Sequence, residues 1–408
     1  MTAHELRDAW AVSGDELEQF KETIADITNS TYVVDAHTAG MTLLHFTGLS
    51  PNDPDRLMFT VHSKRQVEEK RLLGTTLKTG TLTSSGVTPE FIDELKSRSK
   101  LMMRLDNAGA QREDFYFTSA RLARDLAARA QLAGDAVYDP TNERDMYIMS
   151  RYIANPSNVQ VVIRRNSSEN NAVQKIFAMP TMTYQHFDQR IILEMLDAIT
   201  KELGAPKCQK WYVDHFITQL WVTFPDKADD VSKTYGLPDT LVPGVLMETS
   251  NTGDCSLRVI AFWERKRGIH ARLGIYEREH RGRADGATVV ADMSHKLMPN
   301  YTELPYRLCE LLTIDIKDPT AAIEAVFHMA NIPKELGRKR SQNLLDVMTD
   351  LVSTRTSMTG YELAMMFMDL PSYDMDETVL VKAEQIAGKV PFLNFEKIAK
   401  STTAVTPA

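Results

Sequence analysis

The side chains that most readily do chemistry are scattered along this sequence. Glu277 and Glu279 are two residues apart, which on a strand places both carboxylates on one face, where they could hold a metal ion. Arginines surround them, so surface ion pairs are the simpler interpretation. Cys255 lies between Asp254 and Ser256 and would be a nucleophile only with a base beside it. The sequence shows no such base.

The ten histidines have no spacing typical of metal ligands. A metal site could be built from Asp214 and His215, or from His270 and His280, but structural histidines are the simpler interpretation. The sequence contains no GxxxxGK[ST], no GxGxxG after a strand, no HExxH and no GxSxG. We therefore predict no catalytic residue, no cofactor and no metal. Enzymatic activity stays open, with a non-enzymatic protein favoured.

A basic segment is the feature that most suggests a function. Between Arg258 and Arg283, eight basic residues accompany three acidic ones, a local charge of about +5 in a chain of net charge −8. Phosphates need Arg or Lys along a strand, and unpaired bases stack on aromatic rings. Strand alternation would place Arg272, Tyr276 and Arg278 on one face. The predicted nucleic-acid-binding residues are Arg265, Lys266, Arg267, Arg272, Tyr276, Arg278, Arg281 and Arg283.

The same segment has a second interpretation. Its arginines could pair with acidic neighbours, as in a solubilising hairpin, or with another subunit. The predicted partners are therefore single-stranded nucleic acid and further copies of this chain in a homo-oligomer. Because the whole chain is acidic, any contact with nucleic acid must be local.

Three predicted strands carry the basic segment. Gly244–Thr249 is an apolar run, and Ser256–Glu264 is rich in residues that favour strands. Ile269–Glu277 alternates between apolar and polar side chains. The inner face of this third strand would carry its apolar residues, Ala271, Leu273 and Ile275.

The elements around these strands are mixed. Apolar residues between 5 and 27 recur at helical spacing and predict a helix, with a break expected at Ser13-Gly14-Asp15. Trp211–Phe224 is a long β-like run in which Trp211 and Trp221 should be mostly buried. From Leu304 onward the apolar stripes have helical spacing and helix starts carry capping residues, so we expect almost no strand there.

We predict an α+β fold with a central antiparallel sheet, packed helices and a C-terminal helical region. A length of 408 residues suggests two or three domains. The predicted parts are a mixed N-terminal region at 1–150, an α+β core with the basic hairpin at 151–303, a helical region at 304–400 and a disordered tail at 401–408.

The composition indicates which compartment and which membrane contacts to expect for the protein. A hydrophobic fraction of 43% and a charged fraction of 25% are ordinary for a soluble globular chain. No apolar run reaches the roughly 18 residues that a membrane span needs, so we expect no membrane contact. The three cysteines are isolated, which favours a reducing compartment such as the cytoplasm.

The order of elements between Val159 and Leu370 points to a relationship. A predicted hairpin, an aromatic-containing linker and a helix occupy Asn166–Leu203, and the β-run and two strands around Thr249-Ser250-Asn251 follow. A helix begins at Thr359-Gly360-Tyr361-Glu362-Leu363. This order resembles the phage/plasmid-like proteins, a family of unknown function. The family turn usually reads Asn-Ser where this chain has Ser250-Asn251.

The resemblance implies a mobile-element protein of the bacterial host cytoplasm and supplies no catalytic residues. Together with the basic segment, it predicts a phage- or plasmid-encoded nucleic-acid-binding accessory protein, non-enzymatic, that could assist replication or recombination. The alternative is a self-assembling structural protein, such as a virion or shell component.

Overall fold

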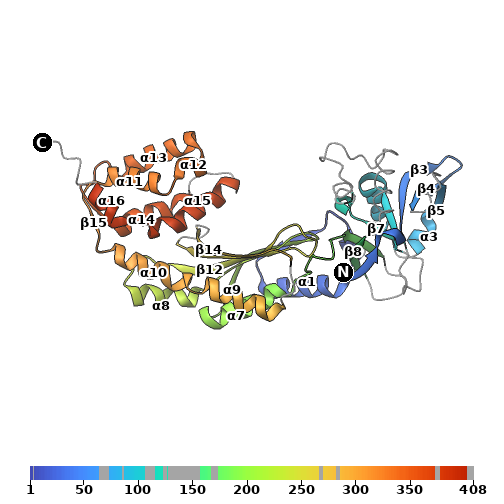
Figure 1. The fold of residues 1–408 in the computed structure, drawn as a ribbon, viewed down its shortest axis with the longest axis horizontal. Coiled ribbons are helices and arrows are strands. Elements are labelled where there is room, and N and C mark those ends of the chain that lie inside the picture. Colours follow the sequence, from blue (N-terminus) through green and yellow to red (C-terminus); the bar gives the residue numbers. More distant parts are fainter. Residues whose placement is uncertain are drawn as a thin grey trace.

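The chain is arranged as three parts in a row. The computed structural model describes residues 1–2, 4–63, 73–84, 87–105, 115–122, 126, 157–166, 173–265, 270–281, 285–372 and 377–401. Figure 1 shows an eight-stranded sheet at one end, a six-stranded sheet in the middle and a helical region at the other end. This is the predicted α+β fold, with a central antiparallel sheet and a C-terminal helical region. Within the described residues, no helix combines the length and apolar character needed to cross a membrane.

The eight-stranded sheet has the order β2-β8-β9-β7-β6-β3-β4-β5, and its β7–β9 pair is parallel. Its strands are β2 Thr31–His37, β3 Met41–Ser50, β4 Asp53–Ser63, β5 Leu73–Lys78, β6 Leu101–Leu105, β7 Phe115–Thr118, β8 Asn158–Arg165 and β9 Gln174–Ala178. Helices α3 Thr79–Ser84 and α4 Pro89–Glu94 accompany them. The predicted boundary at residue 150 lies outside the described residues, and β8 and β9 beyond it belong to this first sheet.

The six-stranded sheet is antiparallel throughout, with the order β1-β10-β11-β12-β13-β14. Its strands are β1 Ala11–Gly14, β10 Lys207–Asp214, β11 Thr218–Thr223, β12 Val242–Thr249, β13 Leu257–Glu264 and β14 His270–Arg278. The three strands predicted for the basic segment are therefore confirmed. The predicted helix over residues 5–27 is wrong in its first half, because β1 pairs with β10 and the helix begins only at Leu17.

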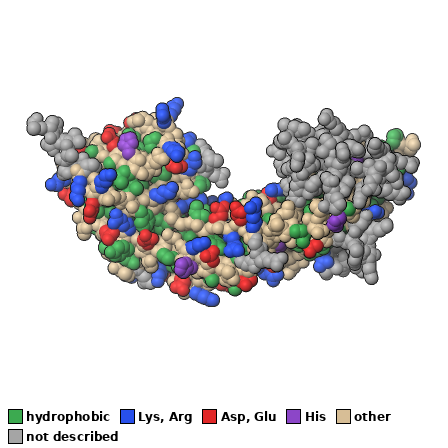
Figure 2. Space-filling view, in the orientation of Figure 1, with side chains coloured by type: hydrophobic (Ala, Val, Ile, Leu, Met, Phe, Trp, Pro, Cys, Tyr) green, Lys and Arg blue, Asp and Glu red, His purple; other side chains and the backbone are tan. Residues whose placement is uncertain are grey.

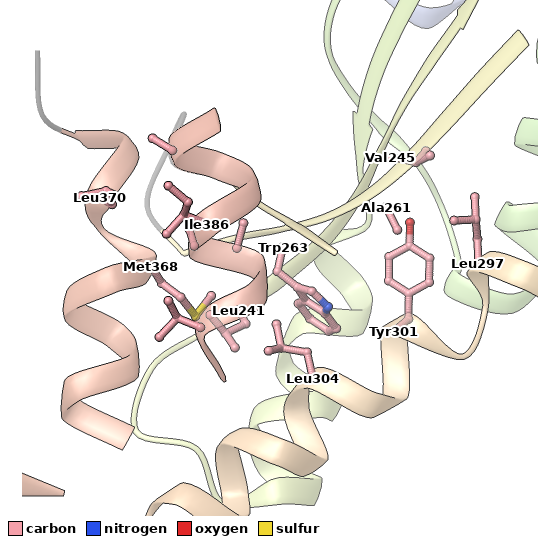
Figure 3. Packing of buried hydrophobic residues seen from close by; sticks show 14 of the residues in the cluster. Leu241, Val245, Ala261, Trp263, Leu297, Tyr301, Leu304, Met368, Leu370 and Ile386 are labelled. Carbon is pink, nitrogen blue, oxygen red and sulfur yellow. The ribbon is translucent and has the colours of Figure 1, made fainter. Parts of the chain in front are cut away.

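Helices cover one face of this sheet. They are α1 Leu17–Ser30, α7 Ile191–Leu203, α8 Pro225–Tyr235, α9 Gly286–Leu297 and α10 Asn300–Leu311. In Figure 3, Trp263 of β13 points between Leu304 of α10 and the C-terminal helices. The Tyr301 hydroxyl donates a hydrogen bond of 2.7 Å to the Gly244 carbonyl oxygen. One apolar core therefore joins the sheet to the helices on both sides of the predicted boundary at residue 304.

The C-terminal region is helical, as predicted. It contains α11 Pro319–Met329, α12 Ile332–Leu336, α13 Arg338–Val352, α14 Gly360–Met368, α15 Glu377–Lys389 and α16 Phe395–Ser401. The described strands here are the two-residue pair β15 Asp315–Ile316 and β16 Met358–Thr359. Local signals set the helix starts: the Asp318 carboxylate accepts from the Ala321 N–H at 3.0 Å, and Thr359 and Glu362 form a capping box. Residues 402–408 of the predicted tail lie outside the described residues.

Helix α15 packs against β14 at a residue without a side chain. A Cβ at Gly388 would overlap the carbonyl group of Arg272, which is backbone and cannot rotate away. Gly388→Ala should therefore push α15 off β14 and lower the free energy of unfolding by about 1–3 kcal/mol. Urea denaturation measures this. Gly80→Ala in α3 is the control, because nothing lies within 4 Å of its Cβ position. An unchanged midpoint for the Gly388 variant would contradict the packing described.

A candidate binding groove on the open face of the six-stranded sheet

The face of the six-stranded sheet opposite α7 to α10 carries a groove. Its volume is about 900 Å³, and residues from all six strands line it, with Val381 and Gln385 of α15 at one end. Figure 2 shows the molecule hollowed between its two ends, above the layer of helices. Neighbouring strands place two rows of side chains across this open face, one apolar and one polar.

The apolar row crosses four strands, β11 to β14, and Lys210 of β10 lies at its end. The register pairs Lys210 with Trp221, Trp221 with Leu246, Leu246 with Ile260 and Ile260 with Ile275. The Lys210 ammonium group lies 4.3 Å from the centre of the Trp221 ring, a cation–π contact. Trp221 was predicted to be mostly buried like Trp211. It is only partly buried, because it faces the groove while Trp211 is buried beside Phe20.

The polar row runs beside the apolar one. Tyr212 is paired with Gln219, Gln219 with Glu248, Glu248 with Arg258 and Arg258 with Glu277. The Gln219 amide donates to Glu248 at 2.6 Å, and the Arg258 guanidinium lies 3.6 Å from Glu248 and 3.1 Å from Glu277. Hydrogen bonds from Ser256 and Arg258 lower the pKa of the Glu277 carboxyl group. Glu277 is therefore ionised and paired with Arg258.

The α15 end of the groove is closed by charged side chains. Arg272 of β14 pairs with Glu384 of α15, and His270 Nδ1 lies 3.5 Å from the same carboxylate. The Arg272 and Glu384 side chains are mostly buried, so this ion pair fastens α15 to the sheet.

The predicted nucleic-acid-binding residues do not form one surface. Arg265 pairs with Asp369 and lies 3.4 Å from Asp239, contacts that hold β13 to the C-terminal region. Arg281 is exposed and lies 3.5 Å from Glu279. Arg278 is partly buried beside Tyr276. Among the predicted residues that the structure describes, only Arg272 also lines the groove. Lys266, Arg267 and Arg283 lie outside the described residues.

The expected exposure of Tyr276 is wrong, and a β-bulge is the reason. Gly274 pairs with Ala261 and Arg272 with Phe262, so Leu273 is an extra residue that reverses the alternation along β14. Tyr276 then lies on the covered face, 1% exposed, and burial raises the pKa of its hydroxyl. Ile275, predicted to face inward, is 48% exposed in the groove. The Tyr276 ring is therefore not available for stacking.

Among the candidate catalytic residues, Cys255 and His280 are neighbours, with the His280 ring beside the Cys255 backbone. Burial raises the pKa of the Cys255 thiol to about 11, so it stays protonated at neutral pH. His215 is fully buried between the two sheets, where burial and the nearby Arg164 and Lys175 hold its pKa well below the usual range. In the part of the chain that the structure describes, no group of three His, Cys, Asp or Glu residues could hold a metal ion.

The sequence interpretation missed the residues that build the groove. Lys210 and Glu248 were not considered, and Arg258 was counted only in the charge of the basic segment. The available signal was the alternation of side chains along β10 to β13, which places Lys210, Trp221 and Arg258 on one face. Comparison with family models, curated proteins and solved structures finds no match to this chain.

Proposed function

We propose that this is a non-enzymatic binding protein that holds a short stretch of single-stranded nucleic acid on the open face of its six-stranded sheet. The observation that supports it best is the partly exposed Trp221 indole beside Lys210, in a groove that Arg258 also lines. A base stacked on an aromatic ring contributes about 1–3 kcal/mol, and every base has such a face.

The charges of the groove determine how phosphates would bind. The Arg258 and Glu277 side chains are 42% and 48% exposed. An ion pair at this exposure is worth about 0–1 kcal/mol, so a phosphate can replace Glu277 at little cost. Arg272 is different, because its pair with Glu384 is mostly buried and fastens α15. Of the described cations that line the groove, Lys210 and Arg258 are therefore left to meet phosphates, and Arg258 also lies 3.6 Å from Glu248.

Two phosphate contacts imply a shallow salt dependence. Each contact to a single strand contributes about 0.7 to the slope of log affinity against log salt, so we expect a slope of about −1.4. Stacking on Trp221 and contact with the apolar row then supply the larger share of the affinity.

The experiment is a titration of short single-stranded DNA and RNA at several salt concentrations. Trp221→Ala should weaken binding roughly 5- to 150-fold, the equivalent of about 1–3 kcal/mol, and leave the salt slope unchanged. Arg258→Ala should flatten the slope by about 0.7. Tyr276→Phe and Arg281→Ala are matched controls outside the groove lining and should bind like the wild type. A wild-type protein that binds no single strand at low salt would overturn the proposal.

We also propose a biological role that would use this binding. A phage- or plasmid-encoded accessory protein that assists replication or recombination in the bacterial cytoplasm would need to hold single strands. Three free cysteines fit a reducing compartment. Lys266, Arg267 and Arg283, predicted contacts that lie outside the described residues, are not counted in the expected salt slope. The alternative, self-assembly, is supported by a different surface in the C-terminal region.

A further inference from the structure

Helix α13 carries its charges in the order opposite to the one a single helix favours. Its first turn contains Arg338, Lys339 and Arg340 and no acid, and its last turn contains no base. Asp346 and Asp350 lie toward its C-terminal end. The helix macrodipole favours acids at the N-terminus and bases at the C-terminus, so this order costs stability in an isolated chain.

The exposed face of α13 also carries large apolar side chains. Val347 is 45% exposed and Leu351 is 60% exposed, one helical turn apart. Lys339, Asn343, Asp346 and Asp350 are spaced four, three and four residues apart, so they form a stripe beside these apolar residues on the same exposed face. Figure 1 places α13 on the outer side of the C-terminal region, and no groove-lining residue belongs to it.

We propose that α13 is a self-association surface, on which the α13 helices of two copies of this chain pack antiparallel around a two-fold axis. In that arrangement the basic start of each helix meets the acidic end of the other, and Lys339 of each copy faces Asp350 of the second. The two macrodipoles run in opposite directions, so the unfavourable charge order of the single helix becomes favourable between copies. Val347 and Leu351 are covered at the contact.

Charge complementarity selects a second copy as the occupant. The surface is basic at one end and acidic at the other, so its complement has the same two ends in reverse order. An antiparallel copy of α13 supplies that order, and a two-fold contact uses the same patch on both chains. This inference does not rest on nucleic-acid binding, because the groove and the α13 surface share no residue.

The test measures the mass of the full chain by light scattering and sedimentation over a range of concentrations. The wild type should form a dimer that weakens in high salt. Lys339→Asp should raise the dimer dissociation constant at least tenfold, because at both symmetric contacts an acid then faces Asp350 of the other copy. Asp350→Lys should have the same effect, because a base then faces Lys339 at both contacts. Mixing these two variants should restore dimers, because each mixed pair then joins one acid to one base. Leu351→Ser should also weaken the dimer.

Loss of folding does not produce this pattern. Lys339→Asp puts an acid in the first turn of α13, so at protein concentrations where the wild type is monomeric its thermal midpoint should not fall below that of the wild type. A monomeric wild type at high protein concentration would overturn the proposal. A dimer that keeps its affinity in both charge variants would overturn it as well, since the contact would then lie elsewhere. Failure of the mixed variants to associate would exclude the Lys339–Asp350 arrangement.

Discussion

Arg164→Met is expected to lower the free energy of unfolding by about 3–5 kcal/mol, because it leaves buried hydrogen-bond acceptors without a donor. Arg164 lies in β8 of the first sheet and is fully buried. Its guanidinium donates to the His215 carbonyl oxygen at 3.1 Å and to Asn251 Oδ1 at 2.9 Å, both in turns of the second sheet. Burial lowers its pKa to about 9, so the side chain remains charged at neutral pH.

Methionine fills much of the space but makes none of these hydrogen bonds. The His215 carbonyl and the Asn251 side chain would stay buried without a donor, at a cost of about 1–3 kcal/mol each. Urea denaturation with a fluorescence readout measures the loss. Arg165→Met is the matched control: its guanidinium lies 5.4 Å from the Tyr32 ring in a partly exposed position, so the change should stay near 1 kcal/mol or less.

A second substitution separates the polar role of Arg164 from simple packing. Asn251→Leu in the Arg164→Met background removes one of the acceptors left without a donor. The double variant should therefore be more stable than the sum of the two single losses predicts. Strict additivity would mean that the two residues are not coupled. An Arg164→Met variant with the wild-type denaturation midpoint would show that the network contributes nothing to joining the sheets.

The sequence predicts an element well where the signal is local. Asp318 and Thr359 cap helices that begin one residue later, and both starts agree with the structure. The three strands of the basic segment are confirmed for the same reason, since each is an apolar or alternating run between turn residues. In these cases the residues that decide the structure are neighbours in the chain.

The face to which a side chain points is less predictable. One bulged residue, Leu273, is enough to move Tyr276 from the groove to the core. An isolated glycine inside a strand run, here Gly274, is a local signal for a bulge, but which residue bulges depends on how β14 pairs with β13. Ala11–Gly14 is a similar case: it lies inside a range predicted as helix with a break at Ser13-Gly14-Asp15, but pairing with β10 makes it an edge strand.

The pairing of charged side chains is also hard to predict from the sequence. The basic segment has a local charge of about +5 along the chain, but its partners come from distant positions. Arg265 meets Asp369 and Arg272 meets Glu384, each more than a hundred residues away, and Arg265 also lies near Asp239, 26 residues away. A run of arginines therefore became a set of ion pairs that hold the helical region to the sheet. Only the folded chain reveals which cations remain for a ligand.

The second large effect that we expect is a loss of stability at acidic pH, caused by buried histidines. His62 of β4 is 2% exposed, and its Nε2 has no hydrogen-bond partner among the residues the structure describes. Burial, and to a smaller extent the charge of the nearby His45, lower the pKa of His62 from 6.5 to about 4. Burial also lowers the pKa of His186 to about 4.

The direction of the effect follows from which state binds the proton. Above pH 6.5, His62 is neutral in both the folded and the unfolded chain, and it has no effect on stability. Between pH 6.5 and pH 4, the unfolded chain binds a proton that the folded chain does not, so stability falls as the pH falls. A difference of this size in pKa corresponds to about 3 kcal/mol once the pH reaches 4.

Unfolding by urea at several pH values between 4 and 7 measures this loss. The wild type should become less stable by at least about 3 kcal/mol across the range, because carboxylates and His186 add to the effect of His62. His62→Leu replaces the ring with an apolar side chain of similar size and should flatten the pH dependence by about 3 kcal/mol. His328→Asn changes an exposed histidine and should follow the wild-type curve. If the His62→Leu and wild-type curves remain parallel from pH 7 to pH 4, His62 does not hold its proton state as described, and its place in the core of the first sheet must be different.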